Sequence, residues 1–384
     1  MKINKRFVYT LIAILFGVLI GSVILLINNI NPVEAYKVIF LGSFGKPKYI
    51  SWVLVRACPY ILTGLSVAFA FQTGLFNIGA EGQYIVGGLG ALIVGILVPM
   101  PPVIHAIVAL FVGGICGAIW GGIVGYLKAK HEVNEVISSI MLNWVAFYLS
   151  NFALTFHSLR NIESDNSYPI LESASIRILG LWKKSEAGKE FLRSNKFIRD
   201  ILNPPVNWGI IFAIICVIVI WYILKKTTLG YELKAVGFNS SAAEYAGINI
   251  NSSIVKSMAI SGALSGLAGA IMVLGVNHNI GRMSSTEGYG FDGMAVALIA
   301  GNSPIGIIPS AILYSALNYG GAKLTTIGTY SEVVKIVIGI IIIFISMPKL
   351  FEILKQRGFK IFKGPKSASG NEAKKDEWFF IKFS

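Results

Sequence analysis

The chain has 384 residues, of which 54% are hydrophobic and only 14% are charged, and its mean hydropathy is +0.69. Soluble domains carry about 25% charged residues, so this composition excludes an ordinary soluble domain and favours an all-α, polytopic membrane protein. The net charge of +14 comes from basic residues that crowd the ends of apolar segments, which suits anionic membrane lipid as a partner and argues against nucleic acid.

Ten apolar segments follow one another along the chain, and a helix needs about 20 apolar residues to span a bilayer. They lie at about 7–28, 50–73, 83–98, 103–127, 134–156, 207–224, 254–275, 290–302, 304–320 and 328–347. The first is longer than the core of a cleaved signal peptide, about 7–15 residues, and is expected to be a span. The eighth and ninth are short and broken by Gly301 and Pro304, so the sequence predicts about ten transmembrane helices, one of them a half-helix or re-entrant.

Clusters of basic residues predict the orientation, because the cytoplasmic loops of membrane proteins are rich in Lys and Arg. The clusters are Lys2, Lys5 and Arg6; Lys225, Lys226 and Lys234; and Lys349, Lys355, Arg357, Lys360 and Lys363. With an even number of spans, both termini are expected in the cytoplasm. The membrane domain would cover 1–363, with an external loop at 157–206 and a cytoplasmic loop at 225–253. A mobile cytoplasmic tail would follow at 364–384.

Five spans precede the external loop and five follow it, which is the parity of two inverted five-helix halves. A weak internal echo supports this arrangement. GLFNIGAEGQYIVGG (74–88) and GYGFDGMAVALIAGN (288–302) each combine glycines, an aromatic residue and an acid or amide with a helix of small residues. Inverted repeats place a substrate site where the halves meet.

The first of these segments contains a polar, glycine-broken stretch, LFNIGAEGQY, between two apolar runs. Irregular backbone at membrane depth is tolerated only where protein buries it or water reaches it. Gly79 and Gly82 would allow the break, and Asn77, Glu81 and Gln83 would offer polar partners to a ligand. A surface loop, or a structural bridge from Glu81 to a neighbouring helix dipole, is the alternative.

The second segment places Asp292 beside Tyr289 and Phe291. An aromatic ring next to a carboxylate suits a ligand with a flat face and hydroxyl groups, such as a nucleoside. An aromatic belt at the membrane interface is the competing interpretation.

The cytoplasmic loop KKTTLGYELKAVGFNSSAAEYAGIN (225–249) carries a third motif. Ser241 and Glu244 have the spacing of a capping box, and Gly247 is suited to end the same short helix. Its small side chains could seat in the groove of another protein, whereas an ordinary interfacial helix is the alternative.

Other features are structural or absent. Gly113, Gly117, Gly121 and Gly125 lie four apart and predict a face for close helix packing. The sequence has no G-x-x-x-x-G-K-[ST] phosphate loop, so any ATP hydrolysis would fall to another subunit. No disulfide framework, metal constellation or catalytic constellation is visible.

Together, GLFNIGAEGQYIVGG, GYGFDGMAVALIAGNSPIG and LKAVGFNSSAAEYAGI resemble the membrane permease subunit of an ABC importer. The superfamily serves branched-chain amino acids, ribose, galactose and nucleosides, and the first two segments resemble its nucleoside branch. The resemblance covers roughly 50–350. It implies a multi-pass protein of the cytoplasmic (inner) membrane that works with a second permease subunit, ATP-binding cassette ATPase subunits and a substrate-binding protein or lipoprotein. ATP and Mg would be bound by the ATPase, and no cofactor is expected in this chain.

The resemblance also assigns roles to residues. The substrate pathway would be lined or shaped by Phe76, Asn77, Glu81, Gln83, Phe291 and Asp292. ATPase coupling would fall to Gly237, Asn239, Ala242, Ala243, Glu244 and Gly247. A simple-sugar permease and a cation-coupled secondary carrier, with Glu81 and Asp292 as ion sites, stay open as alternatives, as does the identity of the nucleoside.

Overall fold

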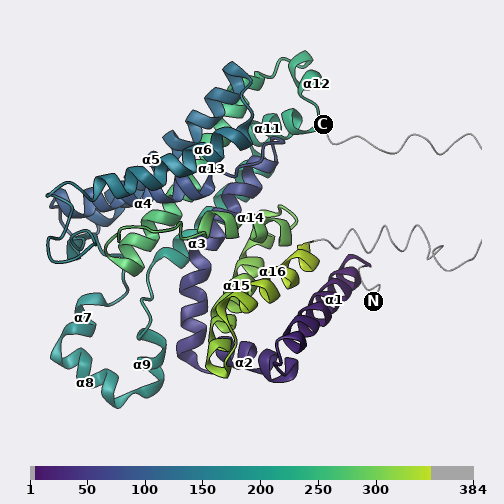
Figure 1. Cartoon of the computed structure of the whole chain (residues 1–384). Helices are drawn as coiled ribbons and strands as arrows, with labels where there is room; N and C mark the ends of the chain where they lie inside the picture. Colours follow the sequence, from purple (N-terminus) through teal and green to yellow (C-terminus); the bar gives the residue numbers. More distant parts are fainter. Residues whose placement is uncertain (1–4, 347–384) are drawn as a thin grey trace, which may run out of the picture.

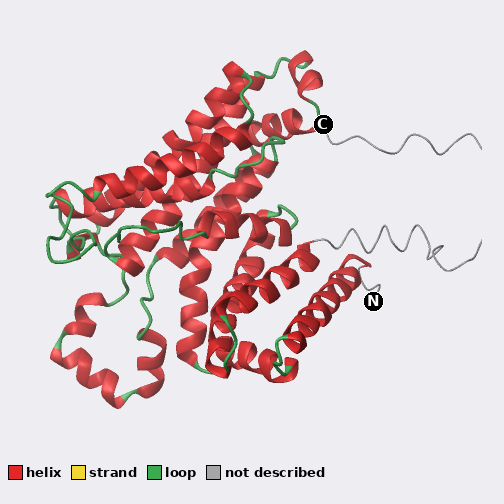
Figure 2. Ribbon diagram, viewed as in Figure 1, coloured by secondary structure: helices red, strands yellow, loops and turns green. Residues whose placement is uncertain are grey.

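The computed structural model describes residues 5–346, and all regular structure in that range is helical (Figures 1 and 2). The main helices are α1 (Lys5–Ile27), α2 (Pro32–Phe44), α3 (Pro47–Phe71), α4 (Ala80–Leu97), α5 (Ile104–His131), α6 (Glu135–Ala153), α7 (Gly180–Lys184), α8 (Glu186–Ser194), α9 (Lys196–Leu202), α10 (Gly209–Lys226), α11 (Thr228–Phe238), α12 (Ser240–Tyr245), α13 (Ile250–Ile271), α14 (Tyr289–Ile299), α15 (Pro304–Gly321) and α16 (Ser331–Ser346). Shorter turns are η1 (Glu172–Ala174), the π-helical η2 (Met272–Asn277) and η3 (Ala322–Ile327). The tail predicted at 364–384 and the last basic cluster lie outside the described residues.

Each of the ten predicted apolar segments falls on a helix, but fewer than ten of these helices are long and apolar enough to be counted as spans. Within 5–346, six helices are long and apolar enough to cross a membrane, or eight if each of two bent pairs is one span. One bent pair is α14 and α15, where the chain direction bends by 120° between the two helices. Gly301 and Asn302 adopt φ values of +59° and +56° at this bend, which explains the break that the sequence predicts there. The protein is therefore a multi-pass membrane protein.

Helices α4, α5 and α13 pack closely through glycines, as the four-residue spacing predicts. A Cβ atom on Gly117 of α5 would overlap the carbonyl oxygen of Gly262 in α13, and one on Gly87 of α4 would overlap the backbone of Gly266. Because only hydrogen stands between these backbones, dispersion contacts between the helices are maximised.

A second group of helices, after that of α4, α5 and α13, packs around α3. Nearly nine-tenths of the most apolar 18-residue stretch of α3 is buried. It packs against α14 and α15, just as α13 packs against α4 and α5. Helices α3 and α13 therefore each contact two helices that lie far from them in the sequence.

The loop at 157–206 contains the short helices α7 to α9 and the turn η1. These helices project from one end of the molecule, and α12 projects from the opposite end (Figure 1). The loop is fastened to the segment after α13, because the backbone amides of Ser167, Ile170 and Ile176 donate to the carbonyls of Ile280, His278 and Leu274, respectively, at 2.8–3.2 Å.

Candidate functional site

The stretch between α3 and α4 is unwound, as predicted, but its polar side chains are buried. Residues 72–79 form no regular helix, and Gly74 has a φ of +73°. Asn77, Glu81 and Gln83 are fully buried. Their polar groups therefore serve the inside of the protein in this conformation and do not face an open cavity.

Asn77 and Gln83 form the centre of a buried network of hydrogen bonds. The Asn77 amide donates to Gln83 Oε1 at 2.9 Å and to Ser261 Oγ at 2.6 Å, while Gln83 Nε2 donates to Asn77 Oδ1 at 3.1 Å. Ser66 of α3 also accepts from Asn77. The network joins α3, α4 and α13 and fixes the unwound segment, because an unpaired amide at this depth would cost about 1–3 kcal/mol.

Glu81 connects the two sequence motifs directly. Its carboxylate accepts from the backbone N–H of Gly288 at 2.8 Å and from that of Gly290 at 2.6 Å. These groups open α14, so Glu81 from the first turn of α4 caps α14. The backbones also touch here, because a Cβ atom on Gly290 would overlap the amide of Glu81. The structural bridge that the sequence left as an alternative is therefore present.

A cluster of tyrosines lies beside this junction. The rings of Tyr84 and Tyr289 are 5.4 Å apart, Tyr289 and Tyr60 are 5.2 Å apart, and Tyr60 and Tyr314 are 4.9 Å apart. Asp292 is partly buried and lies within hydrogen-bonding reach of the hydroxyls of Tyr60 and Tyr314. The sequence points to Tyr289 and Asp292 but gives no signal for the other three, which come from α3, α4 and α15.

Two residues close to Tyr289 in the sequence have exposed side chains. Phe291 is 40% exposed, and the exposed carboxylate of Glu287 accepts from the Tyr84 hydroxyl at 2.7 Å. By contrast, the half-buried ring of Phe76 packs edge-on against Phe71. The residues at 287–292 thus include two aromatic rings, one hydroxyl and two carboxylates.

The short helix predicted in the 225–249 loop is present as α12, although its cap differs from the prediction. Asn239, and not Ser241, is the N-cap residue, and its Oδ1 accepts from the Ala242 N–H at 3.0 Å. Gly247 follows the helix with a φ of +83°. Ala243 is buried, whereas Ala242 and Glu244 are exposed.

Two aromatic residues at α12 are exposed, Phe238 just before the helix and Tyr245 at its end, and the sequence analysis did not identify them. Phe238 is 91% exposed and Tyr245 is 97% exposed. Gly237 has a different position, because a Cβ atom there would overlap the carbonyl oxygen of Gln72 and approach the amide of Gly74 at 3.0 Å. Gly237 therefore packs against the unwound segment that leads to α4.

The comparisons agree with this architecture. Residues 49–346 match the family model for the permease component of the branched-chain amino acid transport system. The chain belongs to this family of transport permeases, which are transport components and not enzymes. In residues 5–346 we find no group of three or more His, Cys, Asp or Glu side chains placed to bind a metal ion.

Curated relatives resemble the chain over most of its length. The guanosine ABC transporter permease protein NupP of Bacillus subtilis is 39% identical over 88% of this chain and 92% of its own. The nucleoside ABC transporter permease protein NupB of Lactococcus lactis is 37% identical over 91% of this chain and 93% of its own. The glucose ABC transporter permease protein TsgB13 of Haloferax volcanii is 30% identical, over 89% and 87%. No solved structure matches the chain.

Proposed function

We propose that this chain is the permease subunit of an ATP-binding cassette importer that moves nucleosides across the cytoplasmic membrane. The observation that carries the proposal is the identity of 37–39% to permeases named for guanosine and nucleosides, against 30% to one named for glucose. The aromatic and carboxylate groups at 287–292 suit the same class of substrate.

The proposed topology has ten spans in two inverted halves, with both termini in the cytoplasm. The exchanged packing of α3 with α14 and α15, and of α13 with α4 and α5, supports the inverted halves. The contact between the first turns of α4 and α14, through Glu81 and Gly290, lies where a two-fold axis between such halves would pass.

The substrate would lie against the face formed by Glu287, Tyr289, Phe291 and Asp292. The rings would stack on the base, and the carboxylates would accept hydrogen bonds from the ribose hydroxyls. Asn77, Glu81 and Gln83 would shape this face from behind by holding α14 and the unwound segment, and Phe76 would support the segment through Phe71.

Transport would be driven from the end of the molecule that carries α12. Phe238 and Tyr245 would seat in the ATPase, which binds ATP and Mg, with the exposed Ala242 and Glu244 beside them. Movement of α11 would reach residues 72–79 through the Gly237 contact and pass to α14 through Glu81. A binding protein or lipoprotein would deliver the nucleoside at the opposite end, beside the 157–206 loop.

The test is uptake by the full chain together with its partner subunits in proteoliposomes. We expect radiolabelled guanosine to accumulate when ATP is present inside the vesicles, and a protonophore to leave that uptake unchanged. Uptake of glucose without guanosine would establish the sugar permease instead. Guanosine uptake that needs no ATP and collapses with the protonophore would establish a cation-coupled carrier.

A further inference from the structure

Three neighbouring cavities share lining residues with one another, and none of them is lined by residues 287–292. The first, of about 630 Å³, lies between the 157–206 loop, the end of η2 and the start of α3. It shares Glu172 and Arg177 with a second cavity of about 720 Å³, which continues over the start of α5. The second shares Ile107 and Leu110 with a third, of about 400 Å³, between α5, α10 and α13.

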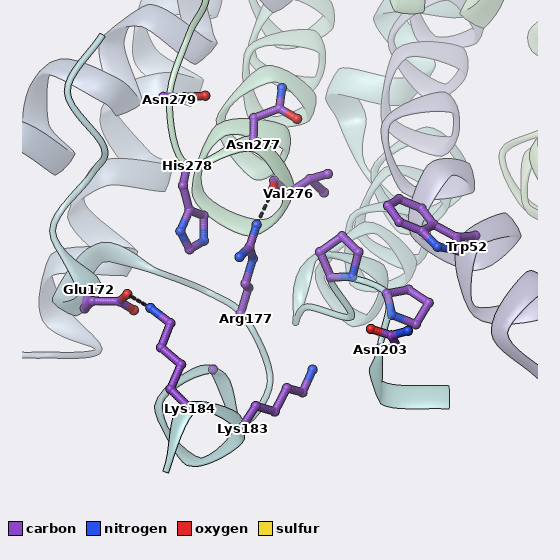
Figure 3. A pocket seen from close by; sticks show the side chains of 13 residues that line it. Trp52, Glu172, Arg177, Lys183, Lys184, Asn203, Val276, Asn277, His278 and Asn279 are labelled. Atoms are coloured by element: carbon purple, nitrogen blue, oxygen red, sulfur yellow. Dashed lines mark hydrogen bonds and ion pairs between the residues drawn. The ribbon is translucent and has the colours of Figure 1, made fainter. Parts of the chain in front are cut away.

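The first cavity is positively charged. Arg177 stands at its centre beside His278, and Lys183 reaches toward it from below (Figure 3). The Arg177 guanidinium donates hydrogen bonds to the backbone carbonyls of Gly275 and Val276, and the Lys183 ammonium donates to that of Leu202. Each retains N–H groups for an anion, because a guanidinium has five and an ammonium three.

The charges of the other lining residues do not neutralise this pair. Glu172 is bound to Lys184 (Figure 3), which cancels one acid against one base. Burial and the nearby Arg177 lower the pKa of His278 to about 4, so its imidazole is neutral at pH 7. Two positive charges, those of Arg177 and Lys183, are left facing the cavity.

The third cavity is an apolar groove. All of its lining residues are apolar or glycine, and Gly114, Ala118 and Ala263 leave the space open because their side chains are small. Its lining on α5 runs from Ile107 to Ala118. Eleven residues of helix rise by about 16 Å, which matches the roughly 15 Å thickness of one leaflet of the hydrocarbon core.

We propose that the connected cavities bind one phospholipid with an anionic headgroup. Its phosphate and headgroup would contact Arg177 and Lys183, its glycerol region would cross the second cavity, and an acyl chain would lie in the groove along α5. A cationic pocket that continues into an apolar groove of one leaflet's depth has the chemistry and the dimensions of such a lipid. The assignment is independent of which solute the permease carries.

The experiment measures lipid that stays bound to the purified full chain. Protein would be incorporated into nanodiscs of phosphatidylethanolamine and phosphatidylglycerol at 3:1, extracted with mild detergent and examined by native mass spectrometry. We expect one retained phosphatidylglycerol per chain. Ala118→Phe fills the groove and should lower retention at least tenfold, whereas Ile119→Phe, on the exposed face of the same helix, should retain the wild-type level. If Ala118→Phe fails to give a monodisperse protein, Ala263→Leu fills the groove from α13.

The headgroup is tested by a second matched pair. Lys183→Gln should lower the preference for phosphatidylglycerol over phosphatidylethanolamine about fivefold, the effect of one basic residue at a lipid surface. Lys189→Gln, whose lysine pairs with Glu186 outside the cavities, should leave it unchanged. Equal lipid retention by the wild type and both groove variants would overturn the proposal. So would a disulfide between Ile115→Cys copies in native membranes, which would place a second chain in the groove.

Discussion

Glu81 joins the start of α4 to the start of α14 through its carboxylate. The sequence shows an acid at membrane depth, and such residues usually have a function, but it cannot show that the carboxylate caps a helix whose N-cap residue, Gly288, lies 207 residues later. The distinction matters for mutagenesis. A residue that shapes the substrate face from behind should change stability as well as transport.

We therefore expect Glu81→Ala to lower the melting temperature of the protein and to abolish nucleoside uptake. Each N–H of Gly288 and Gly290 that loses its acceptor costs roughly 1–3 kcal/mol. Asp292→Asn serves as the control, because it should impair uptake while leaving the melting temperature near that of the wild type. Thermal unfolding in detergent, followed by light scattering, measures both variants. Equal melting temperatures for the wild type and Glu81→Ala would contradict the capping role.

His278 gives the end of the molecule that carries the 157–206 loop a pH dependence. Its folded-state pKa of about 4 lies below the unfolded value of roughly 6.5, so the unfolded state binds more protons between these limits. The contribution of a neutral His278 to stability is therefore complete above about pH 6.5 and is lost as the pH falls toward 4. We expect the melting temperature to fall over this range, and to fall less in His278→Gln. An identical pH profile in the variant would rule out His278 as the cause.

At the scale of the helices, glycines that look alike in the sequence have different environments. Gly117 packs on Gly262, whereas a Cβ atom on Gly122 would lie 3.8 Å from the nearest heavy atom. We expect Gly117→Ala to destabilise the protein by roughly 1–3 kcal/mol through overpacking and Gly122→Ala to be tolerated. Melting temperatures of the two variants, purified in parallel and unfolded by heat alone, test this prediction. Equal destabilisation by both would show that the packed face of α5 is assigned incorrectly.

The helices α11 and α12 separate two roles that the sequence assigns to one motif. Phe238→Ala and Tyr245→Ala remove exposed rings, so we expect them to lower transport-coupled ATP hydrolysis at least tenfold without changing the melting temperature. Gly237→Ala should lower both, because its new methyl group would overlap Gln72. ATPase assays on the reconstituted complex, paired with melts of the isolated chain, provide the measurement. Full coupling in both aromatic variants would remove the docking role of α12.

For the whole molecule, the sequence predicts the positions of the helices well, but it does not predict which helices contact one another. Hydropathy and glycine breaks place all ten apolar segments on helices, because burial in lipid constrains each segment independently. The tyrosine cluster, the Asn77–Gln83 network and the Glu81 cap each need residues from different helices, and a hydropathy pattern carries no record of which helices meet. Length alone also does not fix the number of spans, since α14 has only 11 residues.

The proposed orientation makes a direct prediction for the intact molecule in cells. A cysteine at exposed Glu190 in α8 should react with a membrane-impermeant maleimide from outside, whereas one at Tyr245 should react only after permeabilisation. The native Cys58 is buried and Cys116 and Cys216 are partly buried, and a background without them is the control. Labelling of Tyr245→Cys in sealed cells would invert the topology.

The junction of α4 with α14 limits how such a protein is able to move. The backbone amides of Gly288 and Gly290 would lose their acceptor if α4 and α14 parted at Glu81, and the two backbones already touch there. The motion of lowest energy keeps that point closed and lets the flanking helices rock around it. The helices would then pivot about the polar centre of the molecule, and the protein would open first at one end and then at the other.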